Sequence, residues 1–164
     1  MAKVALLYPP PWKIPGPGEA APGAGEGPPE GYLEGDLDAD FFQIPVGLLQ
    51  LGADARRAGH QVRVLNLSAF PWSRVHAVVR GLDADVFGLS CWTANRRGVA
   101  MVARAIKVHH PGARVVVGGP HATPLAEDVL RHWPEVDLVS IGESDETFLE
   151  ILGRVDRDIP LGGI

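Results

Sequence analysis

Five short apolar segments alternate with five amphipathic segments along this chain of 164 residues, and this alternation limits the possible folds more than any other feature. The apolar segments are 3–7, 61–67, 85–90, 113–117 and 136–141. The amphipathic segments are 45–58, 73–82, 94–109, 123–133 and 144–155. Alternating strands and helices pack as parallel strands joined by right-handed crossovers, with helices on both faces of the sheet. The pattern therefore predicts an α/β domain with a doubly wound, five-stranded parallel sheet.

Local signals indicate where three of these helices begin. Pro45 is expected as a first helical residue, because its fixed φ suits that position. Thr123 and Ser144 are expected as N-caps of the last two helices, since a hydroxyl there can accept a hydrogen bond from a free backbone N–H.

The segment 9–40 interrupts the alternation with a composition that does not build a core. Fourteen glycines and prolines fall within 9–31, and residues 1–40 hold seven acids against two lysines. Such a segment buries too little apolar area to offset the entropy of ordering it. We expect a long, partly mobile insertion after the first strand.

Charge and cysteine content exclude several classes of function. Residues 41–164 hold 13 basic and 13 acidic residues, so the body offers no basic face for nucleic acid. The uncharged stretch 41–53 is too short to span a membrane, and no signal peptide opens the chain, so a cytoplasmic protein is expected. The single cysteine, Cys91, rules out a disulfide framework, a four-cysteine zinc site and a three-cysteine iron–sulfur site in this chain.

Four unusual loops follow the predicted strands, where doubly wound sheets bind their ligands. They are 8–12, 90–98, 118–124 and 142–147. The pair Gly118 and Gly119 would let a ligand approach the backbone, and Gly142 stands beside a helix N-terminus with free amides. Tight turns alone would also explain each glycine. Four such loops at one edge favour a binding site.

The residues in these loops carry a family resemblance. The segments PVGLLQLGADARRAGHQV at 45–62, VVVGGPHATP at 115–124 and DLVSIGESDET at 137–147 resemble the cobalamin-binding domain of cobalamin-dependent radical SAM enzymes. That resemblance implies a Rossmann-like cobalamin-binding domain over 1–155, with 156–164 leading to a catalytic domain absent from this chain. It also implies methylcobalamin or hydroxocobalamin as cofactor and methyl transfer as the reaction. In the full-length protein a [4Fe–4S] cluster and S-adenosylmethionine would complete the machinery.

The resemblance also implies how the cofactor is held. The cobalt-ligating motif Asp-x-His-x-x-Gly is absent, so the corrinoid is expected base-off and without a histidine ligand, its nucleotide tail entering between strands. Trp12 is expected against the lower corrin face, and Gly119 is expected to face the ligand, so that leucine there would block binding and spare the fold. The cofactor-binding residues expected are Tyr8, Trp12, Ser90, Cys91, Trp92, Thr93, Gly118, Gly119, Pro120, His121, Thr123, Gly142, Glu143, Ser144 and Thr147.

Other interpretations stay open at this point. Cys91 suits a small packed residue better than a nucleophile. A cofactor-free regulatory domain of the flavodoxin or receiver type would share the fold, although the acids that receivers need are replaced by Tyr8 and Ser90. A flavin site is disfavoured because the loop after the first strand lacks a phosphate cradle. The cluster motif CxxxCxxC is missing, so this chain alone is expected to bind a cofactor without catalysis.

Overall fold

The computed structural model describes residues 1–10, 44–68, 70 and 72–161. The strands are β1 (Lys3–Tyr8), β2 (Gln61–Asn66), β3 (Val86–Ser90), β4 (Arg114–Gly118) and β5 (Leu138–Val139). The helices are α1 (Val46–Arg57), α2 (Trp72–Gly81), α3 (Arg96–His109), the short 3₁₀ helix η2 (Thr123–Leu125), α4 (Ala126–His132) and α5 (Asp145–Asp156). All four strand pairings are parallel, in the order β2-β1-β3-β4-β5. The predicted doubly wound α/β fold is confirmed.

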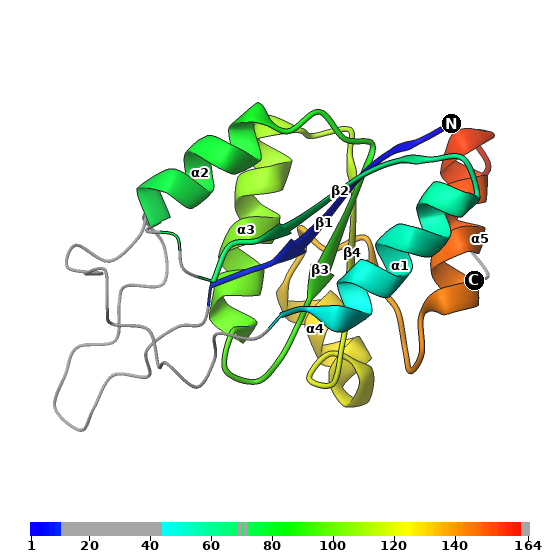
Figure 1. Ribbon diagram of the computed structural model, residues 1–164. Helices are drawn as coiled ribbons and strands as arrows, with labels where there is room; N and C mark the ends of the chain where they lie inside the picture. Colours follow the sequence, from blue (N-terminus) through cyan, green and yellow to red (C-terminus); the bar gives the residue numbers. More distant parts are fainter. Residues whose placement is uncertain (11–43, 69, 71, 162–164) are drawn as a thin grey trace, which may run out of the picture.

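Two apolar layers cover the sheet. Alternate residues of β1 point to opposite faces: Ala5 and Leu7 join the cluster that holds α2 and α3, while Val4 and Leu6 join the cluster that holds α1 and α5. Figure 1 shows α1 and α5 on one face and α2 and α3 on the other. Strands buried on both faces read as continuous apolar runs, which is why the sequence signal was strong.

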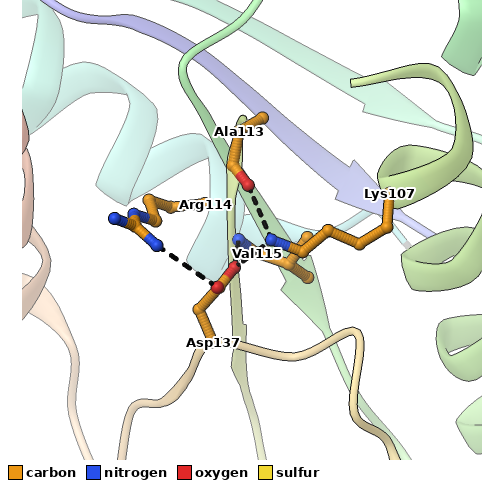
Figure 2. A network of polar contacts seen from close by, with 5 residues as sticks. All are labelled: Lys107, Ala113, Arg114, Val115 and Asp137. Atoms are coloured by element: carbon orange, nitrogen blue, oxygen red, sulfur yellow. Dashed lines mark hydrogen bonds and ion pairs between the residues drawn. The ribbon is translucent and has the colours of Figure 1, made fainter. Parts of the chain in front are cut away.

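The last strand is shorter than the predicted segment 136–141. Just before it, Asp137 donates its backbone N–H to Val115 O at 2.9 Å and also pairs with β4 through its side chain. One carboxylate oxygen accepts from the backbone N–H of Val115 at 2.7 Å and from Lys107 Nζ at 2.6 Å (Figure 2). Arg114 lies 3.5 Å from the other oxygen. β5 lies at the edge of the sheet and pairs with β4 among the described strands. The ion pairs of Asp137 therefore help to hold this short edge strand against β4.

Helix starts differ from two of the three expectations. Pro45 is the N-cap of α1 rather than its first helical residue. Thr123 opens η2, and Leu125 is the N-cap of α4, so the expected cap at Thr123 is wrong. Its hydroxyl instead accepts from the backbone N–H of Gly142 at 3.2 Å. Ser144 occupies the N-cap position of α5 as expected, although its side chain makes no capping hydrogen bond.

Most of the acidic, proline-rich insertion and Trp12 lie outside the described residues. Within the described part, no helix has the length and apolarity that a membrane crossing requires.

Candidate functional site

A pocket of about 480 Å³ opens at the carboxyl edge of the sheet, between the starts of α1 and α5. Its lining comes from β1, β3, β4, the residues after β5 and both helices. The edge predicted from the strand–helix alternation therefore carries a pocket, and a second one, of about 430 Å³, lies at the opposite edge beside Ala2, Asp85 and Arg114. In a parallel sheet of this order, β1 and β3 are neighbours whose crossovers leave toward opposite faces, which opens space above them.

Nine of the fifteen predicted site residues line this pocket. They are Tyr8, Ser90, Trp92, Gly118, Gly119, Pro120, Gly142, Glu143 and Ser144. The fold thus brings together the loops after β1, β3, β4 and β5. Trp92 remains 41% exposed, so its ring is available at the pocket mouth.

The other six predicted residues do not line it. Cys91, Thr93, His121 and Thr123 stand in the same loops, Thr147 lies in the first turn of α5, and Trp12 is outside the described residues.

The apolar walls of the pocket were missed from the sequence. Leu48 and Leu51 of α1, Leu89 of β3, Val116 of β4 and Phe148 of α5 form them. Their spacing marked them as core residues, and in the structure they do pack in or against the core. Sequence periodicity identifies a buried face and does not show where that face leaves a gap.

One polar group inside these walls has no partner. Ser140 follows β5 and donates its backbone N–H to Val117 O at 2.8 Å, and the residue is 4% exposed. Its Oγ is buried with no hydrogen-bond partner among the described residues. A Cβ placed on Gly118 would lie 3.7 Å from Ser140 Cβ and 3.6 Å from Ser144 Oγ, so the absent side chain of Gly118 leaves that space open.

Gly119 plays a different part from the one expected. Its φ is +107°, and a Cβ there would lie 2.7 Å from the carbonyl oxygen of Cys91 rather than in the pocket. The expectation that leucine at this position would spare the fold is therefore wrong, because L side chains rarely adopt this backbone conformation and the neighbour is backbone. Gly119 makes the tight turn, and Gly118 keeps the pocket open.

The buried Asn95 organises the loop after β3 and was also missed. Its Oδ1 accepts from the Trp92 N–H at 2.7 Å, and its Nδ2 donates to Ser90 O at 3.0 Å and to Pro9 O at 3.3 Å. Asn95 precedes α3, and its side chain is fully buried. One amide thus fixes the backbone beside two of the pocket residues.

Burial sets the protonation of the groups near this edge. It raises the pKa of the Cys91 thiol to about 12, so Cys91, which is fully buried, is a packed thiol and not a nucleophile. Burial, and then the charge of Arg96, lower the pKa of His121. Its Nδ1 lies 3.1 Å from Thr93 Oγ1, which orients the ring. Burial also raises the pKa of Tyr8, keeping that hydroxyl neutral.

Comparison with known proteins assigns a family to this architecture. A family model described as the B12 binding domain matches residues 37–152. A 2-(S-pantetheinyl)-carbapenam-3-carboxylate methyltransferase from Streptantibioticus cattleyicolor is 43% identical over 125 residues, which are 74% of this chain and 18% of that protein. The cobalamin-dependent radical SAM methyltransferase TokK from Streptomyces tokunonensis is 28% identical over 130 residues, 79% of this chain and 19% of that protein.

An uncharacterized methyltransferase from Pyrococcus horikoshii is 30% identical over 122 residues, which are 73% of this chain and 26% of that protein. The chain therefore spans about a quarter or less of the curated relatives it matches.

Proposed function

The chain belongs to the B12-binding domain family, and from that premise we propose that it is the cobalamin-binding module of a larger radical SAM methyltransferase. The observation that carries the proposal is the pocket at the carboxyl edge, whose walls are mostly apolar and are formed by the loops after four strands and by the starts of α1 and α5. A corrinoid has a flat, largely apolar macrocycle and a nucleotide tail that ends in a heteroaromatic base. The pocket suits the tail, and the exposed loops above it suit the macrocycle.

The residues present fit such a group. Leu48, Leu89, Val116 and Phe148 can enclose a planar base, and Gly118 supplies no side chain to obstruct it. Trp92 at the mouth can cover part of the macrocycle, and the loop of Gly142 and Glu143 can hydrogen-bond its amides.

We propose a base-off, histidine-off state for the bound cofactor. A base held in the pocket is unavailable to cobalt, and the sequence lacks the ligating motif Asp-x-His-x-x-Gly. His121 stands in the loop after β4, does not line the pocket, and has its Nδ1 3.1 Å from Thr93 Oγ1. This chain's residues would therefore hold the corrinoid through its edges and tail.

Bound methylcobalamin would supply a methyl group to a substrate held elsewhere. The part of this chain is to bind and orient the corrinoid and to keep water from the tail. A [4Fe–4S] cluster and S-adenosylmethionine would belong to a separate catalytic domain, toward which 156–164 would lead. A cytoplasmic location stays a prediction.

Visible absorption during titration with hydroxocobalamin tests the proposal. We expect saturable binding, with the bound spectrum shifted toward that of base-off cobalamin. A chain that leaves the spectrum of free cobalamin unchanged, and that retains none on gel filtration, would instead support a cofactor-free regulatory domain. A bound spectrum of the base-on form would keep cobalamin binding and overturn the base-off state.

A further inference from the structure

The chain leaves β1 through prolines that cannot donate a backbone hydrogen bond to the sheet. Pro9 and Pro10 follow Tyr8, and both are buried. A proline has no backbone N–H, and it restricts the residue before it to extended conformations. The segment 8–10 is therefore stiff, and its two prolines can be fixed only through their carbonyl groups and their packing.

Two residues at the start of α3 hold these prolines in place. Asn95 donates from Nδ2 to the carbonyl oxygen of Pro9 at 3.3 Å. Gly98 lies in the first turn of α3, and a Cβ there would overlap the carbonyl oxygen of Pro10 and lie 3.3 Å from its carbonyl carbon. Glycine is a poor helix former, so the close approach of Pro10 is the physical reason for a glycine at this position.

The other end of the stiff segment is a pocket residue. Tyr8 ends β1, lines the pocket and is only 2% exposed. It belongs to the apolar cluster of Leu48 and Phe148, on the face of the sheet that α1 and α5 cover, whereas α3 covers the opposite face (Figure 1). A displacement of Pro10 at α3 would therefore move a pocket residue on the other face of the sheet.

We infer that Gly98 is a positioning residue for the cofactor pocket, acting through the segment 8–10 on the place of Tyr8. Gly98 itself does not line the pocket. The inference rests on the proposed function and goes beyond it, because it makes the shape of the pocket wall depend on a residue of the helix behind the sheet. The absent side chain of Gly98 lets Pro10 lie against α3, and this leaves Tyr8 in the wall.

The test compares Gly98→Ala with the parent chain by equilibrium dialysis against hydroxocobalamin and by thermal unfolding without cofactor. The new methyl group must push Pro10 away, and the stiff segment passes part of this shift to Tyr8. We expect about a tenfold weaker affinity, because the pocket wall no longer matches the ligand. The melting temperature of the cofactor-free variant is expected to stay near that of the parent, since alanine favours the helix and offsets the cost of moving Pro10.

Gly153→Ala is the matched control. Gly153 is also a helical glycine, in α5, and it lies outside the pocket lining. A Cβ there would lie 3.5 Å from Nη2 of Arg157, at the end of a flexible side chain. That variant should melt at a higher temperature than the parent and bind hydroxocobalamin equally well.

A second variant tests the route through the prolines. When Pro10→Gly is added to Gly98→Ala, the chain after Pro9 can turn away from the new methyl group, because glycine removes the conformational restriction. We expect this double variant to recover most of the lost affinity. It should melt at a lower temperature than Gly98→Ala, since glycine increases the entropy of the unfolded chain.

The outcomes separate the inference from the proposed function. If the parent binds no hydroxocobalamin, the proposed function fails. If the parent binds it and Gly98→Ala binds equally well, or does not fold without cofactor, the assignment of Gly98 fails while cobalamin binding stands. An equal loss of affinity in Gly153→Ala would also overturn the assignment. If the double variant recovers no affinity, the shift does not pass through the segment 8–10, and the inference is wrong.

Discussion

Asn95 donates from Nδ2 to the carbonyl oxygen of Pro9 at 3.3 Å, which ties the loop before α3 to the loop after β1. The contact joins residues 86 positions apart at the edge that carries the pocket. The same amide also holds Ser90 and Trp92. The shape of the pocket mouth therefore depends on a residue that does not line it.

Asn95→Leu should destabilise the chain and weaken cobalamin binding together. The change leaves the Trp92 N–H and the Ser90 and Pro9 carbonyls without their shared partner, which costs roughly 1–3 kcal/mol for each buried group left unsatisfied. Urea denaturation and a hydroxocobalamin titration would measure the two effects. A variant with parental stability would show that the amide is dispensable.

Gly118→Leu should abolish most cobalamin binding while the chain still folds. A Cβ at Gly118 makes ordinary contacts with Ser140 and Ser144, so a larger side chain would occupy the pocket instead of striking backbone. We expect at least a tenfold loss of affinity and a melting temperature near that of the parent. Gly112→Leu is the control, since nothing lies within 4 Å of a Cβ there and Gly112 is outside this pocket.

Gly119→Ala, in contrast to Gly118→Leu, should lower the stability of the chain itself. The φ of +107° and the close Cys91 carbonyl oxygen predict destabilisation by roughly 1–3 kcal/mol even without cofactor. Thermal unfolding of the cofactor-free chain measures this. A parental melting temperature would contradict the role of Gly119 as a turn residue.

These adjacent glycines illustrate how far the sequence could be interpreted. Apolar runs and helical spacing predicted the doubly wound parallel sheet, and the fold then indicated the edge that carries the pocket, because burial of a sheet on both faces requires such runs. The same letters could not separate Gly118 from Gly119, since the difference lies in φ and in which neighbour a Cβ would meet. The unpartnered hydroxyl of Ser140 was likewise unpredictable, because hydrogen-bond satisfaction depends on three-dimensional placement.

Asp137→Asn should loosen the β5 edge. The carboxylate joins Lys107 and Arg114 and accepts from Val115, and both Lys107 and Asp137 side chains are less than a quarter exposed. We expect about 1–3 kcal/mol less stability by urea denaturation, because Lys107 loses its anionic partner. Asp128→Asn on α4, whose pair with Arg131 is exposed, should change stability by less than about 0.5 kcal/mol. Equal effects would contradict a special role for Asp137.

The chain should lose stability as the pH falls below about 6.5, the ordinary pKa of histidine. Burial, and then the nearby His109, lower the pKa of His76, whose Nε2 is buried without a hydrogen-bond partner among the described residues. Burial also lowers the pKa values of His60 and His121. The folded chain therefore binds fewer protons than the unfolded chain in this range. As the pH decreases, the free energy of unfolding decreases too. In His76→Phe, the free energy of unfolding should decrease less between about pH 7.5 and about 5.5 than it does in the parent. If it decreases by the same amount, other groups cause the pH dependence.

His121→Ala tests the proposed histidine-off state. The ring of His121 lies in the loop after β4, with Nδ1 at 3.1 Å from Thr93 Oγ1. If no histidine coordinates cobalt, electron paramagnetic resonance of the bound cob(II)alamin should show no nitrogen superhyperfine splitting, in the parent or in His121→Ala. His132→Ala, on the exposed end of α4, is the matched control for a lost imidazole. Splitting present in the parent and lost only in His121→Ala would make His121 the axial ligand. Splitting kept in all three chains would overturn the base-off, histidine-off state, because the nitrogen would then come from the tail base or from another histidine.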